Sequence, residues 1–293
     1  ITDDIDVRIA YDNDTAGNEG FAKIQSRIPL AKKICYPEGM DANKCLTEGI
    51  DLEQLYQNAE SPRIKGLATV NDYRDTAFNY MTKGYPETQS FGISRDFDLA
   101  ISFYQPELTV VTAAPNSGKS AFTEALCMNL ATLYGKKTGF LTGEKTIDMH
   151  IKGMAHRYSK VDNKKLMDSD TAYNSITFLN DHFYYYNGDV VTIDEILTVA
   201  ERMVRLHGIS CFVIDNWSVL EETCNRGEDQ NQMTSRLINK VQRWIKKNFC
   251  HIIIIAHPKK MEVDPDGYYK LIDGYGISGS AAWYNLPDNG LTL

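Results

Sequence analysis

Residues 108–120 read Leu-Thr-Val-Val-Thr-Ala-Ala-Pro-Asn-Ser-Gly-Lys-Ser, and this stretch decides the fold. Its first five residues are apolar or β-branched throughout, which predicts a strand buried on both faces of a sheet. Beyond residue 120, apolar residues recur at helical spacing until Gly135, a natural helix stop. The stretch therefore predicts a strand, a tight loop and a helix in direct succession.

The loop matches the phosphate-binding pattern Gly-x-x-x-x-Gly-Lys-Ser/Thr, except that Ala113 stands where the first glycine is usual. Such a loop turns backbone N–H groups towards phosphate oxygens at a helix N-terminus. We expect Lys119 to neutralise the β- and γ-phosphates of ATP or another NTP, and the Ser120 hydroxyl to ligate Mg²⁺. The alternative, a chance Gly-Lys-Ser at a helix start, is disfavoured by the order of strand, loop and helix. The residues expected to bind the nucleotide are Ala114, Pro115, Asn116, Ser117, Gly118, Lys119, Ser120 and Ala121.

Four more short, mostly apolar runs follow, at residues 138–142, 182–186, 209–215 and 251–256, with helical patterns between them. Apolar strands that alternate with helices predict a parallel sheet covered on both faces. The expected fold class is α/β: a phosphate-loop NTPase domain with a mainly parallel central sheet, preceded by a partial α/β fragment.

Three polar residues stand at the ends of these strands. Asp215 ends an apolar run, where an NTPase needs a carboxylate to hold a magnesium-bound water; an ordinary turn residue is the alternative. Glu144 follows the strand at 138–142 and is the candidate for activating water, although a glutamate at a helix start also serves as a partner of the helix dipole. His257 ends the strand at 251–256 and is either a γ-phosphate sensor or a structural residue.

Together these segments resemble the RecA-like ATPases, and among them the DnaB-type helicases of superfamily 4, in the branch of phage primase-helicases and Twinkle. The resemblance covers about residues 91–293. It rests on four motifs in family order: Ala-Pro-Asn-Ser-Gly-Lys-Ser (114–120), Val-Ile-Asp-Asn-Trp (213–217), Ala-His-Pro-Lys-Lys (256–260) and Ile-Ser-Gly-Ser-Ala-Ala-Trp-Tyr-Asn (277–285). It implies an ATP-hydrolysing replicative helicase that moves along single-stranded DNA, 5′ to 3′, as a homo-oligomeric ring of six subunits working with a primase or polymerase.

The same resemblance implies residue roles. It makes Lys119, Glu144 and His257 catalytic, and it makes Ser120 and Asp215 the magnesium-binding pair. It also implies a DNA-contacting loop between residues 258 and 280, although a solvated loop is the alternative for its lysines. The residues expected to contact DNA are Lys259, Lys260, Gly279 and Ser280.

The family pattern also places a basic finger on a strand just past residues 288–290. The sequence ends at Leu293, before such a residue, so weak hydrolysis by this chain alone is expected.

The N-terminal residues carry a second resemblance. Asp12-Asn-Asp14-Thr-Ala-Gly17 resembles the Asp-x-Asp and Ala-Gly segment of Toprim domains in primases, where Asp12 and Asp14 would bind a divalent metal; an ordinary turn is the alternative. A short strand at 7–11 and helices from about 16 and 43 are expected around it. The expected domains are the C-terminal part of a Toprim domain at 1–59, a linker with a docking helix at 60–106, and a RecA-like ATPase domain at 107–293, truncated at its C-terminus.

Composition excludes several classes of protein. No apolar run approaches the roughly 20 residues of a membrane span, and six scattered cysteines without a Cys-x-x-Cys pair exclude a zinc ribbon. A net charge of −8 argues against a passive nucleic-acid binder with a large basic surface, but not against a ring that grips one strand through a few loops, so net charge leaves nucleic-acid binding open. No membrane partner is expected, and the expected compartment is the cytoplasm of a bacterial or phage-infected cell.

Two other functions fit the same motifs. One is a RecA- or KaiC-like filament or regulatory ATPase that binds DNA or protein without unwinding. The other is an inactive scaffold that assembles with nucleotide bound, which the absence of a basic finger before Leu293 suggests.

Overall fold

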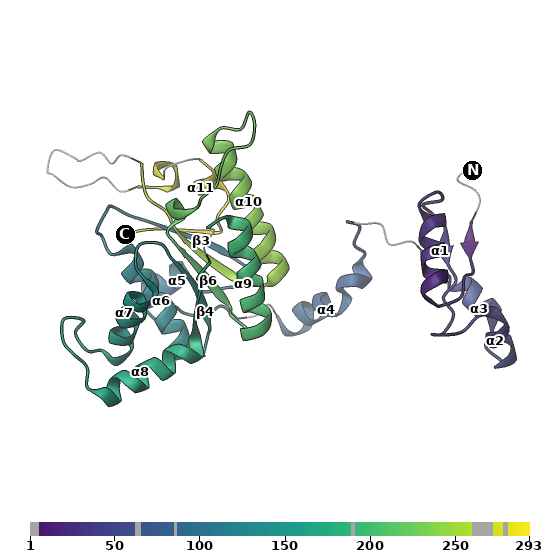
Figure 1. Ribbon diagram of the computed structural model, residues 1–293, viewed down its shortest axis with the longest axis horizontal. Helices are drawn as coiled ribbons and strands as arrows, with labels where there is room; N and C mark the ends of the chain where they lie inside the picture. Colours follow the sequence, from purple (N-terminus) through teal and green to yellow (C-terminus); the bar gives the residue numbers. More distant parts are fainter. Residues whose placement is uncertain (1–5, 62–65, 85–86, 189–190, 260–271, 278–280) are drawn as a thin grey trace. The chain divides into compact units, whose positions relative to one another are not determined.

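The computed structural model describes residues 6–61, 66–84, 87–188, 191–259, 272–277 and 281–293. The chain divides into two compact units, Ile1–Tyr85 and Pro86–Leu293 (Figure 1). Among the described helices, none combines the length and apolar character that crossing a membrane requires.

The second unit is built on one six-stranded sheet in the order β5-β4-β6-β7-β3-β8, and every neighbouring pair of strands is parallel. The predicted strands at 108–112 and 138–142 are confirmed to the residue, and three others are present in slightly shorter form. The last strand was not predicted. The strands are β3 (Leu108–Thr112), β4 (Thr138–Thr142), β5 (Phe183–Tyr185), β6 (Cys211–Asp215), β7 (His251–Ile255) and β8 (Asn289–Thr292).

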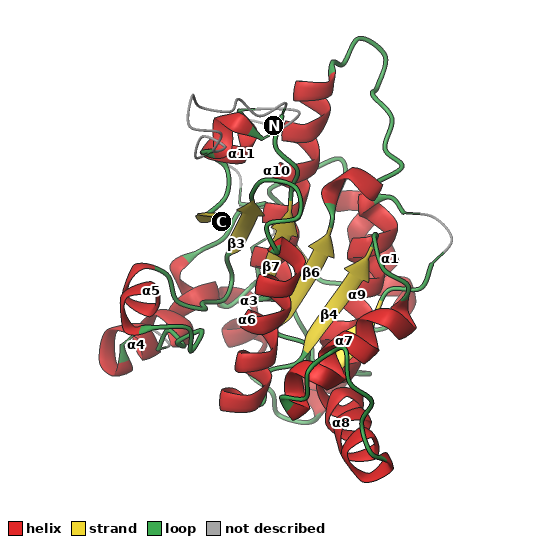
Figure 2. Ribbon diagram, turned by 90° about the vertical axis from the view of Figure 1, so that its left-hand side faces the viewer, coloured by secondary structure: helices red, strands yellow, loops and turns green. Residues whose placement is uncertain are grey.

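Helices cover both faces of this sheet, as strands that are buried throughout require (Figure 2). The side chains of one face pack with α9 and α10, and those of the other face pack with α6, α7 and α8. The helices are α5 (Arg95–Ala100), α6 (Lys119–Tyr134), α7 (Ile147–Ser159), α8 (Ser169–His182), α9 (Ile193–His207), α10 (Gln230–Asn248) and α11 (Ala282–Asn285), with 3₁₀ turns η2 (Trp217–Val219) and η3 (Gly274–Gly276).

Residues 87–106 pack as part of the second unit, although the sequence analysis assigned them to a linker. Phe91 and Phe103 are buried in the core that lies beneath α6. The amide of Asn129 on α6 donates to Phe91 O at 2.9 Å. This segment therefore packs against α6, the helix that follows the phosphate loop, and is hydrogen-bonded to it.

The first unit has a small core of Ile34, Tyr36 and Cys45. The predicted strand and helices are present, the strand in shorter form. Asp14 caps the first helix and Asp41 the second, each by accepting a backbone N–H. The elements are β1 (Arg8–Ile9), α1 (Thr15–Gln25), β2 (Lys32–Lys33), α2 (Ala42–Thr47), α3 (Leu52–Gln57), η1 (Val70–Tyr73) and α4 (Arg74–Lys83).

Candidate nucleotide site

The phosphate loop lies between the end of β3 and the start of α6. Gly118 has φ 88°, and nothing lies within 4 Å of a Cβ built on it, so backbone conformation rather than space favours glycine there. Asn116 also has positive φ, at 61°. Ala113 is not among the described residues with positive φ. This explains why alanine is tolerated where the motif usually has glycine.

Lys119 is held inside its own loop. The residue is 7 % exposed, and Nζ donates to Ala113 O at 3.2 Å and Ala114 O at 3.1 Å. Burial lowers the pKa of Lys119, while the nearby carboxylates of Glu144 and Asp215 oppose that shift. The loop thus concentrates one ammonium among carbonyls and N–H groups at a helix N-terminus, as a phosphate site requires.

Asp215 lies beside Ser120 and, among the described residues, has the burial and the unpaired oxygen that are typical of a cation ligand. It is 8 % exposed, and its Oδ1 accepts no hydrogen bond from the residues that the structure describes. Burial raises the pKa of Asp215, the hydrogen bond with Ser120 lowers it, and Glu144 raises it again. A buried carboxylate oxygen without a donor, next to a hydroxyl, suits a hard divalent cation with oxygen ligands. These residues fit Mg²⁺.

Glu144, His257 and one residue that the sequence analysis did not single out form a cluster at the same edge. Glu144 Oε1 accepts from Asn216 Nδ2 at 2.6 Å and lies 3.2 Å from His257 Nε2. Glu144 and His257 follow β4 and β7, and Asn216 follows β6, so parallel strands bring their carboxyl ends to one edge. The signal for Asn216 was its place directly after Asp215.

Glu144, Asp215 and His257 line one open pocket of about 460 Å³, whereas the buried Asn216 lies outside the lining. The pocket joins phosphate-loop residues to the acids and the histidine at the strand ends. The lining residues are Pro115, Asn116, Gly118, Lys119, Ser120, Ala121, Glu144, Lys145, Asp215, Ile255 and His257. Of the predicted nucleotide contacts, Ala114 and Ser117 are outside this lining and instead bond to each other, Ser117 Oγ donating to Ala114 O at 2.7 Å.

Lys145 also lines the pocket and was not predicted from the sequence. Its ammonium lies 2.7 Å from Glu124, a carboxylate on α6 whose side chain is only 6 % exposed. Arg157 approaches the same carboxylate at 3.0 Å and His150 at 3.5 Å. Burial lowers the pKa of His150 to about 4, so this histidine is neutral near pH 7. The cluster ties the segment after β4 to the phosphate-loop helix.

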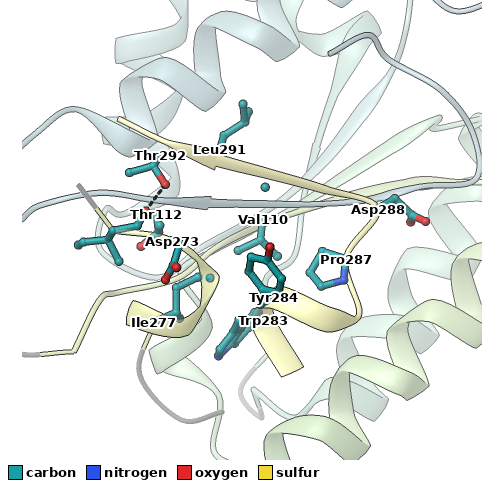
Figure 3. A pocket seen from close by; sticks show the side chains of 13 residues that line it. Val110, Thr112, Asp273, Ile277, Trp283, Tyr284, Pro287, Asp288, Leu291 and Thr292 are labelled. Atoms are coloured by element: carbon teal, nitrogen blue, oxygen red, sulfur yellow. Dashed lines mark hydrogen bonds between the residues drawn. The ribbon is translucent and has the colours of Figure 1, made fainter. Parts of the chain in front are cut away.

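A second pocket, of about 400 Å³, lies along β3 and β8 (Figure 3). Val110, Trp283 and Leu291 contribute apolar walls, and Thr292 Oγ1 donates to Ile272 O at 2.6 Å. It contains none of the phosphate-loop residues, so it is separate from the nucleotide pocket.

Of the predicted DNA contacts, the structure describes Lys259; Lys260, Gly279 and Ser280 lie outside the described residues. The Lys259 backbone N–H donates to Gly276 O at 2.8 Å, and its Nζ donates to Tyr275 O at 3.3 Å. Tyr275 stacks on Tyr284 with ring centroids 4.3 Å apart. Lys259 is thus fixed at the base of the segment that the sequence analysis assigned to DNA.

Asp12 and Asp14 belong to the first unit. Asp14 Oδ1 accepts from Gly17 N at 2.7 Å, which is the bond of a helix N-cap. Within the described parts of the chain, no group of three or more His, Cys, Asp or Glu residues could hold a metal ion. Metal binding by Asp12 and Asp14 remains a prediction.

Comparison with known proteins identifies the family of the chain. The family model for the DnaB-like helicase C-terminal domain matches residues 93–262. The Twinkle homolog protein, chloroplastic/mitochondrial, of Arabidopsis thaliana is 28 % identical over 97 % of this chain and 43 % of its own length. The DNA helicase/primase of Enterobacteria phage T3 is 23 % identical over 97 % of this chain and 53 % of its own. The chain thus spans about half the length of these relatives.

Two solved structures share the fold. The first, an isolated ATPase domain, superposes with a TM-score of 0.62 at 12 % identity, covering 78 % of this chain and 84 % of that one. A DnaB-like replicative helicase, solved to show its interactions with primase, gives a TM-score of 0.52 at 12 % identity, covering 75 % and 54 %. The predicted RecA-like fold is therefore confirmed. The chain belongs to the family of the DnaB-like helicase C-terminal domain, and it is related to Twinkle and to phage helicase/primases.

Proposed function

We propose that this protein is an ATP-dependent replicative DNA helicase that translocates on single-stranded DNA, 5′ to 3′, as part of a primase-helicase. The observation that carries the proposal is the pocket in which the phosphate loop, Glu144, Asp215 and His257 meet at one edge of the parallel sheet. A phosphate cradle supplies binding, and a carboxylate beside it supplies a group that can orient water. Membership of a helicase family supports the link from hydrolysis to DNA.

The residues divide the chemistry among them. Lys119 and the loop N–H groups bind the phosphates, and Ser120 with Asp215 would hold Mg²⁺, which supplies charge neutralisation at the phosphates when bound. Glu144 accepts the proton of the attacking water. His257 hydrogen-bonds Glu144. A contact of the imidazole with the γ-phosphate would therefore change the hydrogen bonding of the carboxylate that activates water.

The partners follow from the same proposal. Single-stranded DNA is gripped by the segment that Lys259 introduces, together with Lys260, Gly279 and Ser280, through phosphates and without sequence preference. The active form is a homo-oligomeric ring of six with ATP between subunits, working with a primase or polymerase in the cytoplasm of a bacterial or phage-infected cell. The first unit is a Toprim fragment; alignment of 97 % of this chain with a phage helicase/primase supports that assignment.

The test is steady-state ATP hydrolysis by the 293-residue chain, with and without a single-stranded oligonucleotide, beside a Lys119→Ala variant. Stimulation by DNA that the variant loses is expected, followed by strand displacement that requires a 5′ rather than a 3′ tail. A rate of hydrolysis that is the same with and without DNA would contradict the helicase proposal and favour a regulatory ATPase of the RecA or KaiC type.

A further inference from the structure

The carboxylate of Glu144 is held through a single oxygen. Asn216 Nδ2 lies 2.6 Å from Oε1 and His257 Nε2 lies 3.2 Å from the same atom. The Glu144 side chain is 55 % exposed, so without these bonds it would sample several rotamers in solvent. Among the described residues both hydrogen bonds fall on Oε1, and Glu144 lines the pocket, so Oε2 is the oxygen that remains to accept from a water there.

Of the two donors, Asn216 is the rigid one. It is 2 % exposed, whereas the side chain of His257 is 38 % exposed. The Asn216 carbonyl Oδ1 accepts the backbone N–H of Ser218 at 3.0 Å and also the Ser218 hydroxyl. Because donors occupy Oδ1, the amide can present only its NH₂ group to Glu144. A flip of the amide would place two acceptors face to face.

The backbone around these residues is fixed as well. The N–H of Gly143 donates to Asp215 O. A Cβ built on Gly143 would lie 2.3 Å from Cγ1 of Val219, so the glycine lets the chain that follows β4 pack directly on η2. Residues 143–144 and 215–219 therefore form one packed unit, and the Asn216 amide is its link to the Glu144 carboxylate.

We propose that Asn216 is a positioning residue for ATP hydrolysis: its amide, locked by η2, fixes the rotamer of Glu144 so that the free carboxylate oxygen meets the attacking water. This inference rests on the proposed function, because it assigns Glu144 the role of activating water. Asn216 itself contacts neither nucleotide nor water in this scheme. Its loss should reduce the rate of the chemical step and leave nucleotide binding, which depends on Lys119 and the loop, nearly unchanged.

The experiment measures kcat and KM for ATP in the wild type, Asn216→Asp and Asn216→Ala. Asn216→Asp keeps the shape and replaces the donor by a carboxylate that repels Glu144, while Asn216→Ala removes the contact. We expect kcat to fall by about 10- to 100-fold in both, and by more in the Asp variant, with KM changed by less than about threefold. Asn239→Asp is the matched control, because Asn239 is an exposed residue of α10 whose side-chain amide donates to Ser235 O, outside the lining of the nucleotide pocket; its kcat should equal that of the wild type.

A double variant separates positioning from general damage. In a Glu144→Gln background the remaining turnover should be insensitive to Asn216→Asp, since the carboxylate that the amide positions is already lost. Two results would overturn the inference: an unchanged kcat in both single variants, or a loss of kcat in the Glu144→Gln background as large as the loss in the wild-type background. In either case the proposed function stands as long as the wild type hydrolyses ATP. Binding of a fluorescent ATP analogue and the thermal midpoint of each variant report whether the fold persists; loss of both in both variants would show a structural role and overturn the inference. Absence of turnover in the wild type would overturn the proposed function and this inference with it.

Discussion

His251 makes the stability of the second unit depend on pH. It is 0 % exposed, its Nδ1 lies 2.7 Å from Tyr104 O, and its Nε2 lies 2.9 Å from Thr109 Oγ1. Burial lowers the pKa of His251 from 6.5 to about 4. Because the folded-state pKa is below the unfolded one, the unfolded chain binds the proton more tightly. Stability is therefore full above about pH 6.5 and falls as the pH drops towards 4.

The size of the effect follows from the two pKa values. One pKa unit corresponds to about 1.4 kcal/mol, so this histidine alone should lower the free energy of unfolding by about 2.5 kcal/mol between pH 7.5 and about pH 4.5. His251→Gln removes the titrating ring and keeps an amide that reaches towards Thr109. The variant should be less stable than the wild type at pH 7.5, and the difference should shrink by about 2.5 kcal/mol on acidification.

The assay is urea unfolding followed by tryptophan fluorescence, because all three tryptophans, Trp217, Trp244 and Trp283, belong to the second unit. Thr109→Val is the matched control, because it removes the hydrogen-bond partner and keeps the titrating group. Its free energy of unfolding should therefore lie below that of the wild type by the same amount at every pH. A wild-type minus His251→Gln difference that is constant from pH 7.5 to about pH 4.5 would refute the argument.

Three further predictions concern the nucleotide pocket. Glu124→Gln removes the charge of a buried carboxylate from its basic partners and should lower the free energy of unfolding by about 1–3 kcal/mol in urea; an unchanged value would show that the cluster contributes nothing. Gly143→Ala forces a Cβ to 2.3 Å from Val219 and should cut ATP turnover at least about 10-fold, whereas Gly153→Ala, on α7 with no atom within 4 Å of the added Cβ, should turn over ATP like the wild type. Glu144→Gln should bind a fluorescent ATP analogue with wild-type affinity and keep only a small residual turnover; weakened binding would assign the carboxylate to the phosphates instead.

The strands of the second unit could be predicted from the sequence because the residue types within each strand indicate it without reference to the rest of the chain. Leu108–Thr112 and Thr138–Thr142 are buried almost throughout and carry β-branched or aromatic residues, so their boundaries match the prediction. The strand Asn289–Thr292 was missed because asparagine and glycine have low strand propensity. It forms because β3 offers an edge with unpaired N–H and C=O groups, a property of the assembled sheet rather than of residues 289–292.

The site was predictable where function follows from position at a strand end, and not where it follows from contact. Lys119, Glu144 and His257 could be found because each follows a recognisable strand or loop. The roles of Asn216 and Lys145 depend on which atoms meet them in space, Glu144 and Ser218 for the first and Glu124 for the second. Asn216 and Glu144 are 72 residues apart and Lys145 and Glu124 are 21 apart, so although Asn216 directly follows Asp215, neither side-chain pairing could be predicted from a local spacing pattern.

The place of β3 between β7 and β8 also determines when the protein can acquire its nucleotide site during synthesis. Thr109 and His251 lie on neighbouring strands and are 142 residues apart, and Leu108 and its partner Asp288 are 180 apart. At ribosomal rates of about 5–20 residues per second, β3 emerges roughly 7–30 s before the first strand that can pair with it. During that interval both edges of an apolar strand are exposed on the nascent chain, and ATP has no completed sheet edge on which to bind. The lining of the pocket extends to His257, so nucleotide cannot stabilise a nascent chain that ends before this residue. Until then, β3 can be covered by elements made earlier, such as α6 packed against residues 87–106.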